Sequence, residues 1–251
     1  MKTLELSRNA IYSGSLILVN GKNPLREAVR EIALVPVDEK NPSALMERQS
    51  ARLLYSLIEE VRARERIVAV SGWRSKSEQT RIYKDSMAEN GRDFTKKHIA
   101  LPGCSEHHTG LAIDLAENKP DIDFIRPEFP YNGICHRFRE KASNFGFVER
   151  YPEGKEYITG IAWEPWHFRY VGFPHSAIMQ QQKMTLEEYH LFLTEHVCGT
   201  NPFVYQTNGR RIEISFQLAE KNSLTKIDVD DGALCFVSGN NTDGFIVTVW
   251  R

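Results

Sequence analysis

Three short stretches of this sequence hold the residue types that a hydrolytic metal site needs. They are Ser71–Ser75, Ser105–Asp114 and Glu164–His167. Together they offer imidazoles, carboxylates and a guanidinium. A catalytic zinc site uses three protein ligands, an open position for water, a general base and a group that stabilises developing charge. No other part of the sequence offers a comparable set, so we predict one metal-dependent hydrolytic centre.

The predicted metal ligands come from two of these stretches. Thr109-Gly110 allows the chain to bend, so that His107 and Asp114 can reach one ion. His167 would add a third ligand from another strand. Two imidazoles and one carboxylate suit zinc and leave a position open for water. His108 adjoins His107, and the spacing alone does not choose between these two histidines.

Two further charged residues would complete the chemistry. Glu164 lies three residues before His167, and in a straight strand their side chains would point to opposite faces. Pro165 fixes the backbone between them, and a bend there would bring both inward. A carboxylate beside the reacting water suits a general base, and Arg74 suits the oxyanion of a tetrahedral intermediate. The alternatives are a solvated acid for Glu164 and a simple ion pair for Arg74.

Helices and strands must position these residues. Leucines at helical spacing predict a helix over 44–64, and Ser75 with Glu78 forms a capping box that starts another over 76–89. In the alternating pattern of 110–116, Asp114 lies on the face opposite Ile113. The other expected elements are buried strands at 16–19 and 67–70, loops over 90–106 and 118–132, a helix over 133–145, strands from 147 and over 166–170, and a helix over 185–197.

The pattern changes after Cys198-Gly199, where short apolar runs alternate with turn signals. Strands are expected at 203–205, 211–218, 224–229, 233–237 and 245–250. We therefore predict a catalytic domain over 1–197 and a small β-rich appendage over 198–251. The appendage is expected to be structural or a homodimer contact, with a wall-binding module as the alternative.

The composition narrows the class of protein. The 251 residues are 41% hydrophobic and 26% charged, as in soluble globular proteins. A net charge of -1 and the lack of a basic block argue against a nucleic-acid partner. No run approaches the ~20 apolar residues that span a bilayer, and the first residues do not read as a secretory signal. We expect a cytoplasmic protein without a membrane anchor.

The three stretches resemble the D-alanyl-D-alanine metallopeptidases of the VanY, VanX and VanXY type. That group belongs to the wider class of lysostaphin-type peptidases and the hedgehog signalling domain. Its signature is SxHxxGxAxD followed by ExxH, and Ser105–Asp114 and Glu164–His167 match every defined position. Ser71–Ser75 with Gln79 resembles the family's G-[YW]-R-S-x-x-x-Q segment. The likeness covers residues 15–180 in order and spacing.

The resemblance implies an α+β fold with a central antiparallel sheet and flanking helices. It favours His107 over His108 as the ligand. The implied roles are zinc ligands His107, Asp114 and His167, catalytic base Glu164, carbonyl-polarising Arg74, and substrate-holding Gln79 and Ser105.

The VanXY type gives the most specific expectation of function. It implies an enzyme that cleaves the D-Ala-D-Ala dipeptide and removes the terminal D-Ala from the UDP-linked muramyl pentapeptide precursor of peptidoglycan. Both activities remove the target of vancomycin and so contribute to resistance. The alternatives are a D,D-carboxypeptidase alone, a wall-peptide endolysin, or a zinc-retaining binding domain like that of hedgehog. Loops 90–106 and 118–132 would decide whether the site admits only a dipeptide.

Overall fold

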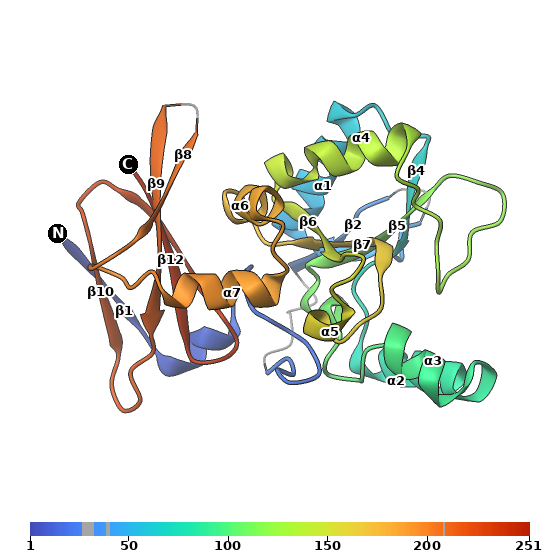
Figure 1. Cartoon of the computed structure of the whole chain (residues 1–251), viewed down its shortest axis with the longest axis horizontal. Coiled ribbons are helices and arrows are strands. Elements are labelled where there is room, and N and C mark those ends of the chain that lie inside the picture. Colours follow the sequence, from blue (N-terminus) through green and yellow to red (C-terminus); the bar gives the residue numbers. More distant parts are fainter. Residues whose placement is uncertain (27–32, 39–40, 208) are drawn as a thin grey trace. The chain divides into compact units, whose positions relative to one another are not determined.

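The computed structural model describes residues 1–26, 33–38, 41–207 and 209–251 (Figure 1). Its contacts define two compact units, one of Val19–Thr185 and one of Met1–Leu18 with Leu186–Arg251. This division differs from the predicted boundary between residues 197 and 198. The reason is that strand β1 (Lys2–Leu6) pairs with strand β10 (Thr225–Val229), which joins the first residues to the C-terminal unit.

The larger unit is built on a four-stranded antiparallel sheet in the order β4-β5-β7-β6. These strands are β4 (Ile67–Ser71), β5 (Ala112–Glu117), β6 (Phe147–Tyr151) and β7 (Glu164–Tyr170). The short strands β2 (Leu34–Pro36) and β3 (Leu45–Glu47) form a second sheet. The helices are α1 (Arg48–Glu60), α2 (Lys76–Glu89), α3 (Gly91–His98), α4 (Gly133–Ala142), α5 (Glu156–Thr159) and α6 (His175–Gln182). An antiparallel sheet with flanking helices confirms the predicted fold class.

The two faces of this sheet differ in character. Ile113 and Phe168 point into the main core, where they meet apolar side chains of α1 and α4 such as Leu57 and Phe138. Figure 1 shows these two helices on one side of the sheet. Because side chains alternate along a strand, Asp114 and the other polar residues of β5 and β7 lie on the opposite face. The predicted alternation is thus confirmed. It places the candidate site residues of β5 and β7 on the sheet face that does not pack against α1 and α4.

Three sequence predictions differ from the structure. The helix predicted over 44–64 begins only at Arg48, because β3 pairs with β2 and the Glu47 carboxylate accepts the backbone N–H of Gln49 at 2.9 Å as a cap. The stretch 90–106 is not all loop, since it contains α3. The run 16–19 is buried as predicted but forms no strand. The sequence also gave no sign of α5 and α6.

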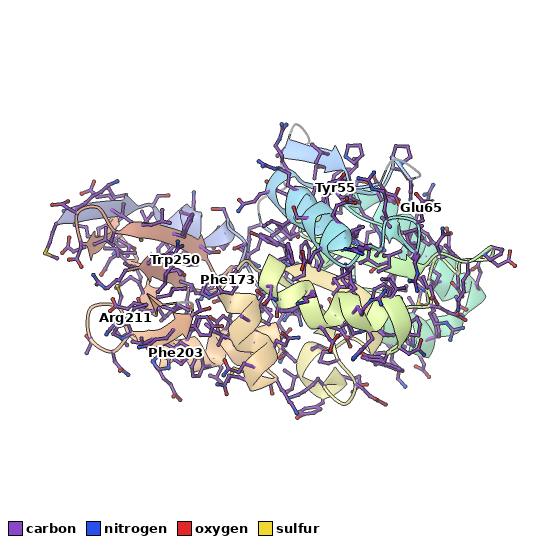
Figure 2. All side chains as sticks on the ribbon, turned by 90° about the horizontal axis from the view of Figure 1, so that it is seen from above. Tyr55, Glu65, Phe173, Phe203, Arg211 and Trp250 are labelled. Carbon is purple, nitrogen blue, oxygen red and sulfur yellow. The ribbon has the colours of Figure 1, made fainter. Side chains whose placement is uncertain are left out.

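The remaining elements of this unit follow the sequence. Helix α2 begins and ends at the predicted residues, and the Ser75 side chain accepts the backbone N–H of Glu78 at 3.1 Å. Two 3-10 turns are η3 (Glu106–Thr109) and η4 (Ser143–Phe145), and Gly146 in the left-handed region ends the second. Tyr55 stands out from α1 in Figure 2, on the helix face away from the core.

The smaller unit contains a four-stranded antiparallel sheet in the order β11-β12-β9-β8 and the β1-β10 pair. Its other elements are the 3-10 helix η1 (Arg8–Tyr12), helix α7 (Leu186–Thr194), and strands β8 (Phe203–Thr207), β9 (Arg210–Leu218), β11 (Leu234–Gly239) and β12 (Gly244–Trp250). All five predicted strands are therefore confirmed. Figure 2 labels Phe203, Arg211 and Trp250 on three of them. Among the described residues, no helix is long and apolar enough to cross a membrane.

Candidate active site

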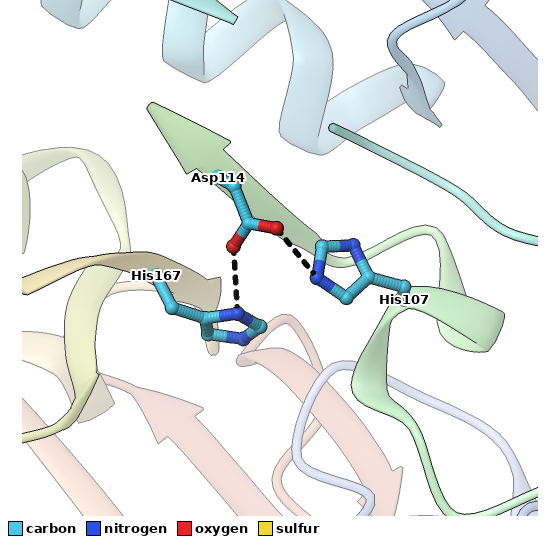
Figure 3. Close-up of side chains that lie close together, drawn as sticks. All are labelled: His107, Asp114 and His167. Atoms are coloured by element: carbon cyan, nitrogen blue, oxygen red, sulfur yellow. Dashed lines mark hydrogen bonds and ion pairs between the residues drawn. The ribbon is translucent and has the colours of Figure 1, made fainter. Parts of the chain in front are cut away.

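The three predicted metal ligands meet on the polar face of the β4–β7 sheet. Asp114 on β5 lies opposite His167 on β7, and η3 brings His107 alongside. His167 Nδ1 is 2.9 Å from one oxygen of Asp114, and His107 Nε2 is 3.1 Å from the other (Figure 3). All three side chains are buried, and their ligand atoms lie within 4.8 Å of one another. The described residues hold no second group of this kind.

Two glycines allow the chain to place His107. Gly110 ends η3 with a φ of +69°, and a Cβ there would come 2.9 Å from a methyl group of Leu34. A Cβ on Gly72 would lie 2.3 Å from the carbonyl oxygen of Leu45. The Gly72 carbonyl is 2.6 Å from Nδ1 of His107 and can only accept, so Nδ1 donates. Nε2 of His107 is left with its lone pair facing Asp114.

His108 has a different role from its neighbour. Its Nδ1 is 2.8 Å from the Arg74 carbonyl and therefore donates, while its Nε2 accepts the backbone N–H of Gly103 at 3.0 Å. Both ring nitrogens are thus engaged by the backbone. This arrangement supports His107 as the ligand and makes His108 an anchor for the segment that carries Arg74.

Arg74 lies at the junction of β4 and α2, which correspond to the strand predicted at 67–70 and the helix predicted over 76–89. Its Nη2 is 2.8 Å from Asp114 and its Nε is 2.8 Å from the Ser71 hydroxyl. Its Nη1 lies 3.3 Å from Oε1 of Gln79, whose own amide donates to the Ala100 carbonyl at 2.9 Å. The ion pair proposed as the plain alternative is therefore present, and it holds the guanidinium beside the metal ligands.

Glu164 reaches the site because β7 is irregular. Phe168 pairs with Glu149, and the next pair along the strands is Glu164 with Tyr151, so β7 advances four residues where β6 advances two. This bulge turns Glu164 inward together with His167, whose Nδ1 is 3.7 Å from the Glu164 carboxylate. Burial raises the pKa of Glu164 to about 8, since desolvation disfavours its charge.

The two candidate histidine ligands differ electrostatically. Desolvation and the nearby Arg74 guanidinium lower the pKa of His107 to about 4, which keeps the ring neutral. Desolvation acts in the same direction on His167, but its hydrogen bond to Asp114 and the nearby carboxylates of Glu106 and Glu164 outweigh it. The pKa of His167 is raised to about 9. A metal ion would have to displace a proton there, because only the deprotonated nitrogen binds a metal.

A pocket opens over these residues. Its polar side includes Gln79 and Ser105, both buried. Its apolar side includes Phe124 and Ile125, which belong to the long loop over 118–132. The remaining lining residues are Arg74, Ile82, His98, Ile99, Ala100, Glu106, His107, Asp114, Tyr151, Ile161, Glu164, Trp166 and His167. Every predicted site residue therefore lines one pocket.

Among the lining residues that the sequence did not point to, three have titratable side chains. Tyr151 lies in a strand without a motif, and its ring centroid is 4.8 Å from that of His167. His98 ends α3, the helix that the sequence did not predict. Glu106 lies inside the matched signature, but at a position the signature leaves undefined. An acid next to a ligand histidine was the available signal for Glu106.

Comparison with known proteins identifies the family. Residues 43–173 match VanY, described as D-alanyl-D-alanine carboxypeptidase. Over 184 residues the chain is 41% identical to the bifunctional D-Ala-D-Ala dipeptidase and D-Ala-D-Ala carboxypeptidase VanXYC of Enterococcus gallinarum, covering 73% of this chain and 97% of the relative. The chain belongs to the VanY family of peptidases.

Two solved structures are similar to this one. The vancomycin resistance D,D-dipeptidase VanXYg, in complex with a D-Ala-D-Ala phosphinate analogue, matches with a TM-score of 0.96 and 50% identity over 100% of this chain and 99% of that chain. A mutant D,D-pentapeptidase VanY from a VanB-type resistance cassette, in complex with Zn(II), matches with a TM-score of 0.55 and 28% identity over 70% of this chain and 98% of that chain. The predicted family, fold class and peptidase class are confirmed.

Proposed function

We propose that this chain is a zinc-dependent D,D-peptidase that cleaves the D-Ala-D-Ala dipeptide and removes the terminal D-Ala from the cytoplasmic UDP-linked muramyl pentapeptide precursor. Both reactions would contribute to glycopeptide resistance. One observation carries the proposal: Glu164 lies beside Nδ1 of His167, the nitrogen that faces Asp114, and all three residues line one pocket. The similarity to VanXYg over the whole chain supports the substrate class.

The donor set fits zinc. His107, Asp114 and His167 supply two nitrogens and one carboxylate at close range, and three protein ligands leave a position for water. The similar VanY structure contains Zn(II). Bound zinc would supply a Lewis acid that polarises the scissile carbonyl and makes water acidic enough to react near neutral pH.

Glu164 is the proposed general base. Its carboxylate takes a proton from the attacking water and then delivers that proton to the leaving amine of the departing D-Ala. A pKa of about 8 suits both steps, because a group that titrates near the working pH can accept and release a proton.

Arg74 is the proposed stabiliser of the oxyanion. Its guanidinium remains charged, and contacts with Ser71 and Gln79 hold it in place before substrate arrives. Preorganised charge of this kind stabilises a transition state without a reorganisation cost. Gln79 and Ser105, which line the same pocket, would help to position the substrate backbone.

A carboxypeptidase that does not cleave the dipeptide is the second candidate. The observation that favours it is the match of residues 43–173 to VanY, described as D-alanyl-D-alanine carboxypeptidase. Phe124 and Ile125 line the pocket, so their loop over 118–132 would influence which substrates fit. The Arg74 guanidinium lies over the Phe124 ring, 5.8 Å from its centroid, so this loop also contacts the proposed oxyanion stabiliser.

Release of D-alanine tests the proposal. D-Ala-D-Ala and the UDP-linked muramyl pentapeptide are offered separately to purified protein, with L-Ala-L-Ala as the stereochemical control. Each assay is run with a chelator and again after zinc is restored. We expect zinc-dependent release from both D-substrates and none from the control. Release from the pentapeptide alone would establish the carboxypeptidase, and release from neither by zinc-loaded protein would overturn the proposal.

A further inference from the structure

A fully buried ion cluster lies directly behind the candidate metal site. Arg150 Nε and Arg169 Nη1 each lie 2.8 Å from the same oxygen of Glu106, Oε1. The side chains of all three are 0% exposed. Burying charges costs several kcal/mol per ion unless they are paired and hydrogen-bonded. Such a cluster therefore needs an explanation beyond stability.

The second oxygen of Glu106 points at a metal ligand. Oε2 lies 3.5 Å from Nε2 of His167, which is longer than a hydrogen bond. Both atoms are buried, and neither has a hydrogen-bond partner among the described residues. The other ring nitrogen of His167, Nδ1, faces Asp114 at 2.9 Å and Glu164 at 3.7 Å. The imidazole of His167 thus lies between the proposed metal position, which its Nδ1 faces, and Glu106, which its Nε2 faces.

The chemistry of imidazole gives this placement a consequence. A neutral ring carries one proton, so Nδ1 can bind a metal only when the proton is on Nε2. That Nε2–H then needs an acceptor, and here the facing atom is a carboxylate oxygen. Arg150 and Arg169 stabilise the ionised carboxylate, and an ionised carboxylate can only accept.

We propose that Glu106 is a positioning residue for the metal centre, accepting the Nε2–H of His167 and so selecting the tautomer whose Nδ1 binds the ion. Closing the 3.5 Å gap by a few tenths of an ångström completes the hydrogen bond. The inference rests on the proposed metal site but not on the proposed substrate. A carboxylate that accepts the second N–H of a ligand histidine fixes the orientation of the ring and strengthens its binding to the metal.

The two histidine ligands would then bind the metal through different ring nitrogens. His107 donates from Nδ1 to a backbone carbonyl, that of Gly72, and presents Nε2 to the metal. His167 would donate from Nε2 to a side-chain carboxylate and present Nδ1. A backbone carbonyl cannot be removed by substitution, whereas Glu106 can. The second arrangement is therefore open to direct test.

The test is Glu106→Gln, with zinc affinity measured by competition with a chromophoric chelator. The amide oxygen of the variant would accept from Arg150 and Arg169, which turns its NH2 group towards His167. A donor there opposes the Nε2–H tautomer. We expect zinc affinity to fall about 10–100-fold. In proton NMR of the zinc-loaded protein, we expect the downfield Nε2–H signal of His167 to move upfield or exchange faster.

The matched control is Glu149→Gln. Glu149 also pairs with a largely buried arginine, Arg139, at 2.8 Å, but it does not line the pocket. This control should lose stability and keep the zinc affinity of the wild type. A folded Glu106→Gln protein with unchanged zinc affinity and an unchanged Nε2–H signal would overturn the proposal, leaving Glu106 as a counter-charge for the arginines.

A second variant covers the case in which Glu106→Gln does not fold. Glu106→Asp keeps the charge but draws the carboxylate back by one methylene, so it cannot serve both the arginines and His167. Weaker zinc binding by this variant supports the proposal, and unchanged binding overturns it. Wild-type protein that binds no zinc would refute the metal site itself. Zinc-loaded protein that releases no D-alanine would refute only the proposed substrate.

Discussion

The two four-stranded antiparallel sheets of this protein differ most in what they bury. The strands of the β4–β7 sheet bury Asp114, Arg150, Glu164, His167 and Arg169. Within its described residues, the β8–β12 sheet buries no charged side chain and no imidazole on its strands, only small hydroxyl groups such as that of Ser215. Desolvating an ionisable group is costly. Buried charge therefore separates the sheet that carries the candidate active site from the sheet whose strands bury only apolar and hydroxyl side chains.

The two sheets also differ in regularity. Register shifts occur between Ala69 and Ser71 where β4 meets β5, and between Glu149 and Tyr151 where β6 meets β7. In the other sheet, the pairing of β11 with β12 and of β12 with β9 runs without a shift. Bulges re-aim side chains. The irregular positions precede Arg74 and accompany Glu164, so the distortions lie where site residues must turn inward.

The largest expected effect is on turnover. Replacing Glu164 by Gln removes the proposed base from the β4–β7 sheet but leaves the three metal ligands. We expect kcat for D-alanine release to fall about 10²–10⁴-fold, the usual contribution of general acid–base catalysis. Zinc content, measured by atomic emission, should remain that of the wild type. Turnover near the wild-type rate would show that Glu164 is not the base.

The same substitution in β7 and directly after β12 tests the contrast in buried charge. Arg169→Met removes one partner from the buried Glu106 cluster, and we expect a loss of about 3–5 kcal/mol in the free energy of unfolding. Arg251 pairs with Glu213 at 2.8 Å with 40% of its side chain exposed, so Arg251→Met should cost at most about 1 kcal/mol. Urea unfolding followed by circular dichroism measures both. Equal losses would contradict the comparison.

Substitutions of the adjacent residues His107 and His108 should have different effects on metal content. His108→Ala leaves the Gly103 N–H and the Arg74 carbonyl without their partner, which we expect to cost about 1–3 kcal/mol of stability. Metal content should persist, because His108 does not face Asp114. His107→Ala is the matched change one residue away and should lose the metal. If instead the His108 variant lost zinc and the His107 variant kept it, the ligand assignment would be reversed.

The smallest effect is expected in the β8–β12 sheet. Ser215 is a buried hydroxyl on β9, at 6% exposure. Ser215→Ala should change the free energy of unfolding by no more than about 1 kcal/mol, the usual net contribution of one neutral hydrogen-bonding group. D-alanine release should be unchanged. A large loss of activity in this variant would mean that the smaller unit contributes to the reaction.

Local features of the sequence predicted the candidate site and several elements of the fold. The spacing of His107, Asp114 and His167 identified the candidate site, and alternation in β5 and β7 separated its polar face from the core. The capping box at Ser75 located the start of α2. The alternation and the capping box each lie within a few residues along the chain, whereas His167 lies in a separate stretch from His107 and was linked to it by residue type and by the family resemblance. Short-range patterns reflect helix caps and strand pleating, which neighbouring residues decide.

Contacts between distant residues decided the features of the fold and of the site that the sequence did not predict. Glu47 belongs to a strand end and not to a longer helix because β3 pairs with β2. The N-terminal strand joins the C-terminal unit, as in the hydrogen bond of Thr3 with Asp228, 225 residues along the chain. Glu106 faces His167 only after η3 and β7 come together. The sequence alone determined which groups were available for chemistry. Tertiary structure decided which nitrogen, oxygen and guanidinium meet, because orientation and burial depend on strand pairing and bulges between distant segments.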